Sequence, residues 1–308
     1  MDWKELNIED CLFRYRSFDK EGRNIDALKN GRLYFSSPMW FNDPYDSLVF
    51  AKADKIWGEM CLSFYYGMDQ YIESVKKKYP EEAFVAYHFW NTDKEKALQL
   101  TYDDFHKSLK LVRNQIRRNT KVICFSESYD SMLMWAHYAD YHKGFALMYT
   151  KEEIRNGGVY SKDGKRIGDN VRIDPVEYVE KQQDLTNDVG WYVRENVMRK
   201  DSSFIPSDRS VGITKVRRVL LEKAKEWSYE KEWRVTERRP EFIRESKASY
   251  IDCCPKAILV GSQCEQGNHE LLISISKELR IPIFRMYLSE NENGFILRPG
   301  KGNPYYCF

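Results

Sequence analysis

The alternation of polar and apolar positions is clearest over residues 229–235, which read Tyr-Glu-Lys-Glu-Trp-Arg-Val. Because successive side chains of a β-strand point to opposite faces, a strand here places Glu230, Glu232 and Arg234 in one row. Residues 216–227 carry apolar side chains at helical spacing, so we expect a helix that leads into this strand. Two carboxylates about 7 Å apart on one strand face raise each other's pKa, whereas an adjacent arginine lowers it. The alternative is a solvated strand face with an ordinary salt bridge.

Short apolar runs bounded by turn residues predict the other strands. They cover residues 12–17, 33–36, 122–126, 144–149, 171–178, 249–252, 257–260 and 283–287. Helices are expected over 24–30, ended by Gly31, over a segment that Ser128 or Asp130 caps, and over 269–279. Residues 160–170 are expected to form a loop or hairpin tip, and 202–212 a mobile loop.

Residues 54–119 have a helical pattern. One apolar seam within them alternates by four and three, at Leu98, Tyr102, Phe105, Leu109, Val112 and Ile116. It is shorter than three heptads, which favours packing within the chain, with a homodimer seam as the alternative. No linker divides the sequence, so we predict one α+β domain over 1–308, with a mixed, mostly antiparallel central sheet and 54–119 as a helical insertion.

The composition excludes several classes of protein. The chain has 308 residues, 42% hydrophobic and 15% aromatic, so it can form a substantial core. Its net charge of +2 gives no general electrostatic reason to bind nucleic acid or membrane. Basic stretches at 113–121 and 215–218 fit solvated helix faces, with phosphate-binding patches as the alternative. No apolar run is long enough to span a membrane.

The cysteines and histidines do not form a recognisable metal motif. Seven scattered cysteines include an adjacent pair, Cys253 and Cys254, but no CxxC. His137 and His142 are five residues apart with no third ligand nearby, so we expect no metal. The first residues are polar and charged, unlike a secretion signal. We therefore expect reduced thiols and a cytoplasmic location.

Several sequence blocks, in order along the chain, resemble a bacterial family known only as domain of unknown function 2971. They are residues 13–17, 28–38, 41–44, 124–127, 134–140, 142–145, 227–234 and 258–261. Among them are Phe41-Asn42-Asp43-Pro44, Met134-Trp135-Ala136-His137-Tyr138 and Trp227-Ser228-Tyr229-Glu230-Lys231-Glu232-Trp233-Arg234. Each block alone is weak, and their shared order makes the resemblance specific.

A looser resemblance is to the ADP-ribosyltransferase fold, in which an early basic strand, a serine-bearing strand and a late Glu-x-Glu strand hold and cleave NAD. It implies that Arg14 contacts the pyrophosphate and that Ser36 and Ser37 lie on the serine-bearing strand. It also implies that Glu232 drives cleavage of the nicotinamide–ribose bond while Glu230 orients the acceptor. An aromatic residue such as Tyr15 or Tyr138 would stack on nicotinamide, and Asn42 would reach a ligand amide.

These assignments have ordinary structural alternatives. Arg14 could equally be an exposed residue of a surface strand. Ser36 and Ser37 are also typical of the turn before a proline, and the Asn42 segment is also typical of a turn. The sequence therefore predicts, as an untested hypothesis, an NAD-consuming enzyme that modifies a macromolecule, protein or nucleic acid, in a toxin or antiphage role. The alternatives are a non-catalytic module that binds a nucleotide or peptide, and a nucleic-acid-binding protein.

Overall fold

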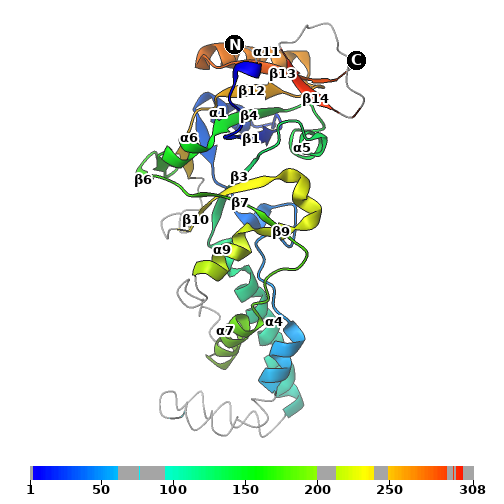
Figure 1. The fold of residues 1–308 in the computed structure, drawn as a ribbon. Helices are drawn as coiled ribbons and strands as arrows, with labels where there is room; N and C mark the ends of the chain where they lie inside the picture. Colours follow the sequence, from blue (N-terminus) through cyan, green and yellow to red (C-terminus); the bar gives the residue numbers. More distant parts are fainter. Residues whose placement is uncertain are drawn as a thin grey trace. The chain divides into compact units, whose positions relative to one another are not determined.

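The computed structural model describes residues 3–61, 76, 94–199, 213–238, 249–289, 294 and 296–300. Contacts divide the chain into two units (Figure 1). Unit 1 comprises Met1–Asn42, Asn119–Glu180 and Leu221–Phe308, and unit 2 comprises Asp43–Arg118 and Lys181–Leu220. Unit 2 thus contains the predicted insertion and, in addition, a later segment. A single domain over 1–308 stays a prediction.

Unit 1 is built on a sheet of eight described strands in the order β14-β13-β12-β4-β1-β3-β10-β7. These strands are β1 (Cys11–Arg16), β3 (Lys121–Ser126), β4 (Phe145–Thr150), β7 (Ile173–Pro175), β10 (Glu232–Glu237), β12 (Ala257–Val260), β13 (Ile283–Leu288) and β14 (Leu297–Gly300). Among these described strands, β12 and β13 pair in parallel and the other neighbours are antiparallel. The prediction of an α+β fold with a mostly antiparallel sheet is confirmed.

Two smaller sheets complete the β-structure of unit 1. One contains β2 (Arg32–Tyr34), β11 (Tyr250–Asp252), β5 (Val159–Tyr160) and β6 (Arg166–Gly168), and the other β8 (Glu177–Val179) and β9 (Glu222–Ala224). Its helices are α1 (Arg23–Lys29), α5 (Met132–Tyr138), α6 (Lys151–Asn156) and α11 (Gln266–Leu279). Short 3₁₀ helices are η1 (Trp3–Glu5), η2 (Pro38–Trp40) and η3 (Lys225–Glu230).

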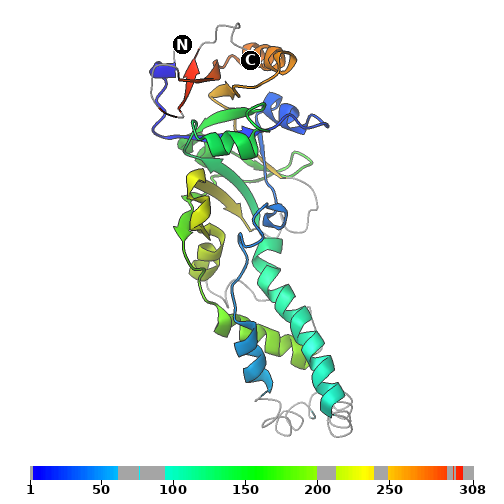
Figure 2. The same cartoon turned by 90° about the vertical axis from the view of Figure 1, so that its right-hand side faces the viewer.

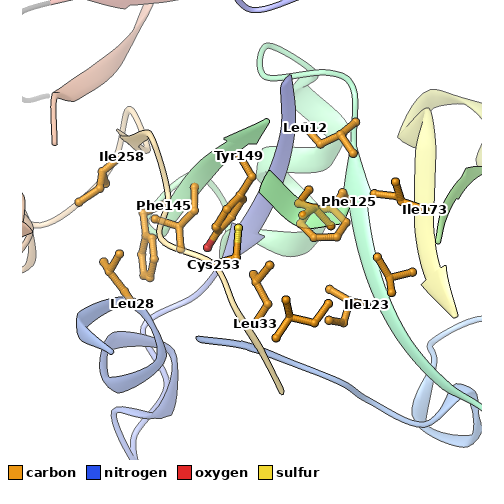
Figure 3. Close-up of a cluster of buried hydrophobic side chains, with 14 of the residues drawn as sticks. Leu12, Leu28, Leu33, Ile123, Phe125, Phe145, Tyr149, Ile173, Cys253 and Ile258 are labelled. Atoms are coloured by element: carbon orange, nitrogen blue, oxygen red, sulfur yellow. The ribbon is translucent and has the colours of Figure 1, made fainter. Parts of the chain in front are cut away.

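Both faces of the large sheet bury apolar side chains, because its strands alternate between two cores. On one face, Leu12, Phe125 and Tyr149 pack with Leu28 of α1 and Leu33 of β2 (Figure 3). On the other face, Phe13, Tyr15 and Met148 of the same strands pack with Met134 and Trp135 of α5 and with η1. Neighbouring residues of one strand therefore belong to different cores, on opposite sides of the sheet.

Unit 2 is helical, with α4 (Lys94–Arg118), α7 (Thr186–Arg199), most of α9 (Ile213–Leu221) and a helix over 53–61. Figures 1 and 2 both show α7 alongside α4. The predicted seam residues from Phe105 onward are buried against α7 and α9, with partners that include Val189, Val193 and Val219. The seam thus packs within the chain, as predicted, whereas a homodimer stays a prediction.

Some expected elements were wrong. The helix expected over 216–227 ends at Leu221, where β9 begins. The segment 171–178 divides into β7 and β8, which belong to different sheets. Ser131 caps α5 by accepting a 3.3 Å hydrogen bond from the Met134 amide, in place of Ser128 or Asp130. The sequence reading missed α7, and the expected loop over 202–212 lies outside the described residues.

Within the described part of the chain, none of the helices combines the length and the apolarity that a membrane span requires.

Candidate functional site

The two glutamates of the Glu-x-Glu motif belong to different elements. Glu230 is the last residue of η3, and Glu232 is the first residue of β10. Lys231 between them has φ 44° and ψ 52°, in the left-handed region. The prediction of one continuous strand over 229–235 is therefore wrong for its first half, because a sharp turn separates the two acidic residues.

Both carboxylates nevertheless converge on one lysine. Lys223, in β9, donates to Oε2 of Glu230 and to Oε2 of Glu232, the second at 3.1 Å. Arg234 holds Glu232 in a two-point contact, with its Nε 2.8 Å from Oε1 and its Nη2 2.9 Å from Oε2. We call Lys223, Glu230, Glu232 and Arg234 the charged cluster. Each side chain is at most 6% exposed, so these ionic contacts replace the hydration that the four charges lose.

The charged cluster drives its two carboxyl pKa values apart. Burial raises the pKa of Glu232, but Arg234 and then Lys223 outweigh burial and hold it at about 2. Burial likewise raises the pKa of Glu230, and the neighbouring Glu232 charge adds to this, so Lys223 does not bring the pKa back to its ordinary value. Glu232 is thus a fixed anion, whereas Glu230 takes up a proton more readily than an ordinary glutamate.

A chain of hydrogen bonds leads from Glu230 towards the surface of unit 1. The Tyr138 hydroxyl donates to Oε1 of Glu230 at 2.6 Å, and Nδ2 of Asn42 donates to the same hydroxyl at 3.3 Å. Tyr138 is half-buried at the end of α5, and Asn42 is exposed just after η2. Burial, and then the Glu230 carboxylate, raise the pKa of the Tyr138 phenol far above its ordinary value. Tyr138 is therefore a neutral donor to Glu230.

Side chains from two further segments hold the backbone of this site. The Ser126 hydroxyl donates to the Glu230 carbonyl at 2.6 Å, and the Tyr178 hydroxyl accepts from the Glu232 amide at 2.8 Å. Lys223 Nζ lies 5.0 Å from the centre of the Trp227 ring. Sequence reasoning missed Lys223, Ser126 and Tyr178 as parts of the site. The sequence held one signal for Lys223, since two carboxylates close together need a second cation besides Arg234.

The predicted ligand-binding residues do not all come together. Glu230, Glu232, Tyr138 and Asn42 form one connected site. Arg14 lies on the opposite face of the sheet, 5.9 Å from the Phe125 ring centre. The resemblance implies that Arg14 and Glu232 hold the same ligand, and their positions on opposite faces of the sheet do not support this.

Three other predicted residues make local contacts of their own. The Tyr15 side chain shares the Glu232 face but packs edge-on against Trp135, and its hydroxyl donates to the Ser128 carbonyl at 2.7 Å. The Ser36 hydroxyl donates to the Val122 carbonyl at 3.2 Å, and Ser37 caps η2 through the Met39 amide at 3.3 Å. Ser37 thus makes the turn contact that was the alternative interpretation, whereas Ser36 bridges to β3, and the role of both serines towards a ligand stays a prediction.

Acidic and thiol groups do not gather into a metal site in the described residues, where no group of three or more His, Cys, Asp or Glu side chains could hold an ion.

Comparison with known proteins identifies a family without assigning a function. Residues 134–235 match the model of a family described as protein of unknown function (DUF2971). The predicted family resemblance is confirmed over this segment, which contains α5, Lys223, both glutamates and Arg234. No curated protein sequence and no solved structure is significantly similar to the chain.

Proposed function

Because the family matched by residues 134–235 has no described activity, we propose a function from the geometry of the charged cluster. We propose that this protein is an NAD-consuming enzyme of the ADP-ribosyltransferase type, with Glu230 as its acting carboxylate. One observation carries the proposal: two glutamates two residues apart have pKa values shifted in opposite directions, and Glu230, whose pKa is raised, connects to the surface through Tyr138 and Asn42. Such divergent pairs are typical of acid–base sites.

The residue types suit cleavage of the nicotinamide–ribose bond. When that bond breaks, neutral nicotinamide leaves with the bonding electrons and positive charge develops on the ribose. A nearby carboxylate stabilises this charge, and a base accepts the proton that the attacking nucleophile loses. Glu230 fits both needs, directly or by relay through the Tyr138 hydroxyl, which lies 2.6 Å away. The choice of NAD as substrate rests on the Glu-x-Glu resemblance.

The structure changes the roles that the resemblance implied for individual residues. Arg234 and Lys223 already occupy the Glu232 carboxylate, so we assign Glu232 the positioning of Lys223 in place of direct contact with substrate. Tyr138 and Asn42 remain the ligand-facing groups of the proposal. Arg14, Ser36 and Ser37 are not required by it, since Arg14 faces the other side of the sheet and both serine hydroxyls bond to the backbone.

The test is release of nicotinamide from NAD by the purified protein, with and without cell lysate. We expect Glu230→Gln to reduce the rate at least a hundredfold, because the isosteric amide can neither hold negative charge nor accept the proton. Glu226→Gln is the matched control, since Glu226 lies exposed in the same 3₁₀ helix η3. NAD labelled in the adenylate portion separates transfer to protein or nucleic acid from simple hydrolysis. Equal rates for the two variants, or no release by the unsubstituted protein under either condition, reject the proposal.

A non-catalytic binding module is the second candidate function. The observation that favours it is the charge balance of the cluster, in which two carboxylates are matched by one lysine and one arginine. A balanced network of this kind needs no ligand, and its role would then be to hold the start of β10 against the end of η3. This candidate predicts that a nucleotide stabilises the protein without turnover and that the stabilisation survives Glu230→Gln.

The third alternative, binding of nucleic acid, relied on two basic stretches. Within unit 2, Arg113 donates to the Val49 carbonyl at 3.0 Å, and Arg117 donates to the Asp46 carbonyl at 2.7 Å. Lys215 is paired with Asp188 at 2.9 Å. These contacts favour a packing role for the stretches.

A toxin or antiphage role adds the expectation that expression slows growth and that Glu230→Gln relieves this effect.

A further inference from the structure

A cavity lies within unit 1, on the face of the large sheet opposite to the charged cluster. Its volume is about 450 Å³, in the range of small-molecule sites. It is bounded by α1, β2 and the inward side of β1 and β4. Apolar residues Leu28, Leu33 and Tyr149 form part of its wall and converge in Figure 3. The cavity is thus partly apolar and is shaped by elements that also form the core.

The same cavity is lined by four arginines, Arg14, Arg16, Arg23 and Arg32. Two of them have internal partners, since Arg23 pairs with Asp19 and Glu21, and Arg32 lies 4.5 Å from the Tyr250 ring centre. Asp26, which also lines the cavity, is exposed on α1. Because a ring carries no net charge, the excess of positive charge comes from Arg14, Arg16 and Arg32, of which Arg14 is buried.

Arg14 is a buried cation without a counterion in the described structure. Only 8% of the residue is exposed. One of its terminal nitrogens, Nη2, donates to the Tyr34 carbonyl at 3.0 Å, whereas its buried Nε has no hydrogen-bond partner among the described groups. Burial, and then the neighbouring Arg16, lower the pKa of Arg14 to about 9. A guanidinium in this position is poorly compensated and has a free donor.

Arg16 adds a second positive charge to the same wall. It lies two residues further along β1, so both guanidinium groups project from one face of the strand. Its described contact is with the Tyr15 carbonyl, at 3.3 Å, and no carboxylate within the described residues pairs with it. Burial lowers the pKa of Arg16 as well. Two like charges on one wall destabilise the folded protein, and an anion that both arginines contact would offset this repulsion.

We propose that this cavity binds an organic phosphate of nucleotide or sugar-phosphate size, with its phosphate between Arg14 and Arg16. The planar guanidinium group offers paired donors that match two phosphate oxygens. The apolar and aromatic walls, including Leu28, Leu33 and Tyr34, face the remainder of the ligand. Because the sheet separates this cavity from Glu230, binding here is independent of the proposed catalytic function.

The test is thermal stabilisation and calorimetric binding of the full chain at fixed ionic strength. The probes are AMP, ribose 5-phosphate, inorganic phosphate, adenosine and succinate. We expect AMP or ribose 5-phosphate to bind more tightly than inorganic phosphate, and adenosine and succinate not to bind. Arg16→Gln should weaken phosphate-ester binding at least tenfold, because it removes one of the two cations.

Arg155→Gln is the matched control, because it removes an equal charge from an exposed position in α6, outside the cavity. Arg14→Met is the second variant, and its circular dichroism shows whether the buried substitution folds. Absence of binding by every phosphate ester, equal weakening by Arg155→Gln, or tighter binding of succinate would each overturn the assignment. Nicotinamide release by Arg16→Gln reports separately on the Glu230 site, so failure of one proposal does not imply failure of the other.

Discussion

Arg14 and Glu232 lie on opposite faces of one β-sheet, two strands apart. Phe13 pairs with Ser126, which pairs in turn with Glu232, so these three residues share a face. Arg14 follows Phe13 and therefore points the other way, towards the core that contains Phe125 and Tyr149. This relationship separates the acidic site from the arginine-lined cavity and gives each an independent test.

The Glu232–Arg234 contact should be a strongly coupled, buried pair. Arg234→Met is expected to reduce the free energy of unfolding by about 3–5 kcal/mol, because it leaves Glu232 short of a buried counterion. The double variant Glu232→Gln/Arg234→Met should lose much less than the sum of the two single losses. Urea unfolding measures all three values. Arg172→Met breaks an ion pair in which the arginine is 66% exposed, so it should cost about 1 kcal/mol or less. Additive losses would contradict the coupling.

Stability in acid should depend on Glu232. Its pKa of about 2 in the folded protein lies below its ordinary value of 4.5, so its carboxylate stabilises the fold above pH 4.5. This contribution, on the order of 3 kcal/mol, should disappear as the pH falls from about 4.5 to 2. Unfolding of the protein at successive pH values measures the loss, and a carbon NMR titration of the glutamate carboxyl groups gives the pKa without substitution. A pKa of Glu232 at or above 4.5 would contradict the arrangement.

Tyr138→Phe should affect the ionised form of Glu230 more than its neutral form. The substitution removes the hydroxyl that donates to the Glu230 carboxylate, so the pKa of Glu230 should rise further above its ordinary value. The loss of stability should be about 1.5–3 kcal/mol at a pH above the raised pKa of Glu230, where its carboxylate is ionised, and smaller at a pH below that pKa.

The measurement for Tyr138→Phe is urea unfolding at both pH values. Tyr141→Phe is the control, because Tyr141 is 72% exposed, and it should change stability little at either pH. A loss of equal size above and below the pKa of Glu230 would show that the Tyr138 hydroxyl does not act on a titrating carboxylate.

Gly261 should not tolerate a side chain. A Cβ atom there would lie 2.0 Å from the His142 carbonyl oxygen and 2.9 Å from the Gly144 carbonyl oxygen. The His142 amide donates to the Trp135 carbonyl at 3.1 Å, so a shift of this loop would disturb the end of α5, where Tyr138 lies. Gly261→Ala is expected to destabilise the protein by about 1–3 kcal/mol.

The control for this substitution is Gly267→Ala, because no atom lies within 4 Å of an added Cβ in α11. It should be neutral, or stabilise the helix by up to about 1 kcal/mol. Thermal unfolding compares the two variants. Equal melting temperatures would show that the loop around His142 can move without cost.

The sequence by itself determined the local features of this protein. Short apolar runs bounded by turn residues placed β1, β3, β4 and β12 within one or two residues, because strand-forming runs and the turns that bound them are properties of neighbouring positions. The ordered blocks predicted a family resemblance, which the family model matches over residues 134–235, and the Glu-x-Glu segment singled out Glu230 and Glu232. Tyr138 and Asn42, which the sequence also singled out, are joined to Glu230 by hydrogen bonds, and their predicted role towards a ligand stays a prediction.

Only the tertiary structure decided how these local features meet. A single strand pattern states which residues share a face, but it does not state which face of the finished sheet that is, because strand pairing joins distant segments. Arg14 was therefore assigned to the wrong side relative to Glu232. Lys223 was hidden in an expected helix, and the left-handed turn at Lys231 was hidden in an expected strand. Burial then determined the ion pairs, because four charged side chains removed from water are stable only in contact with one another.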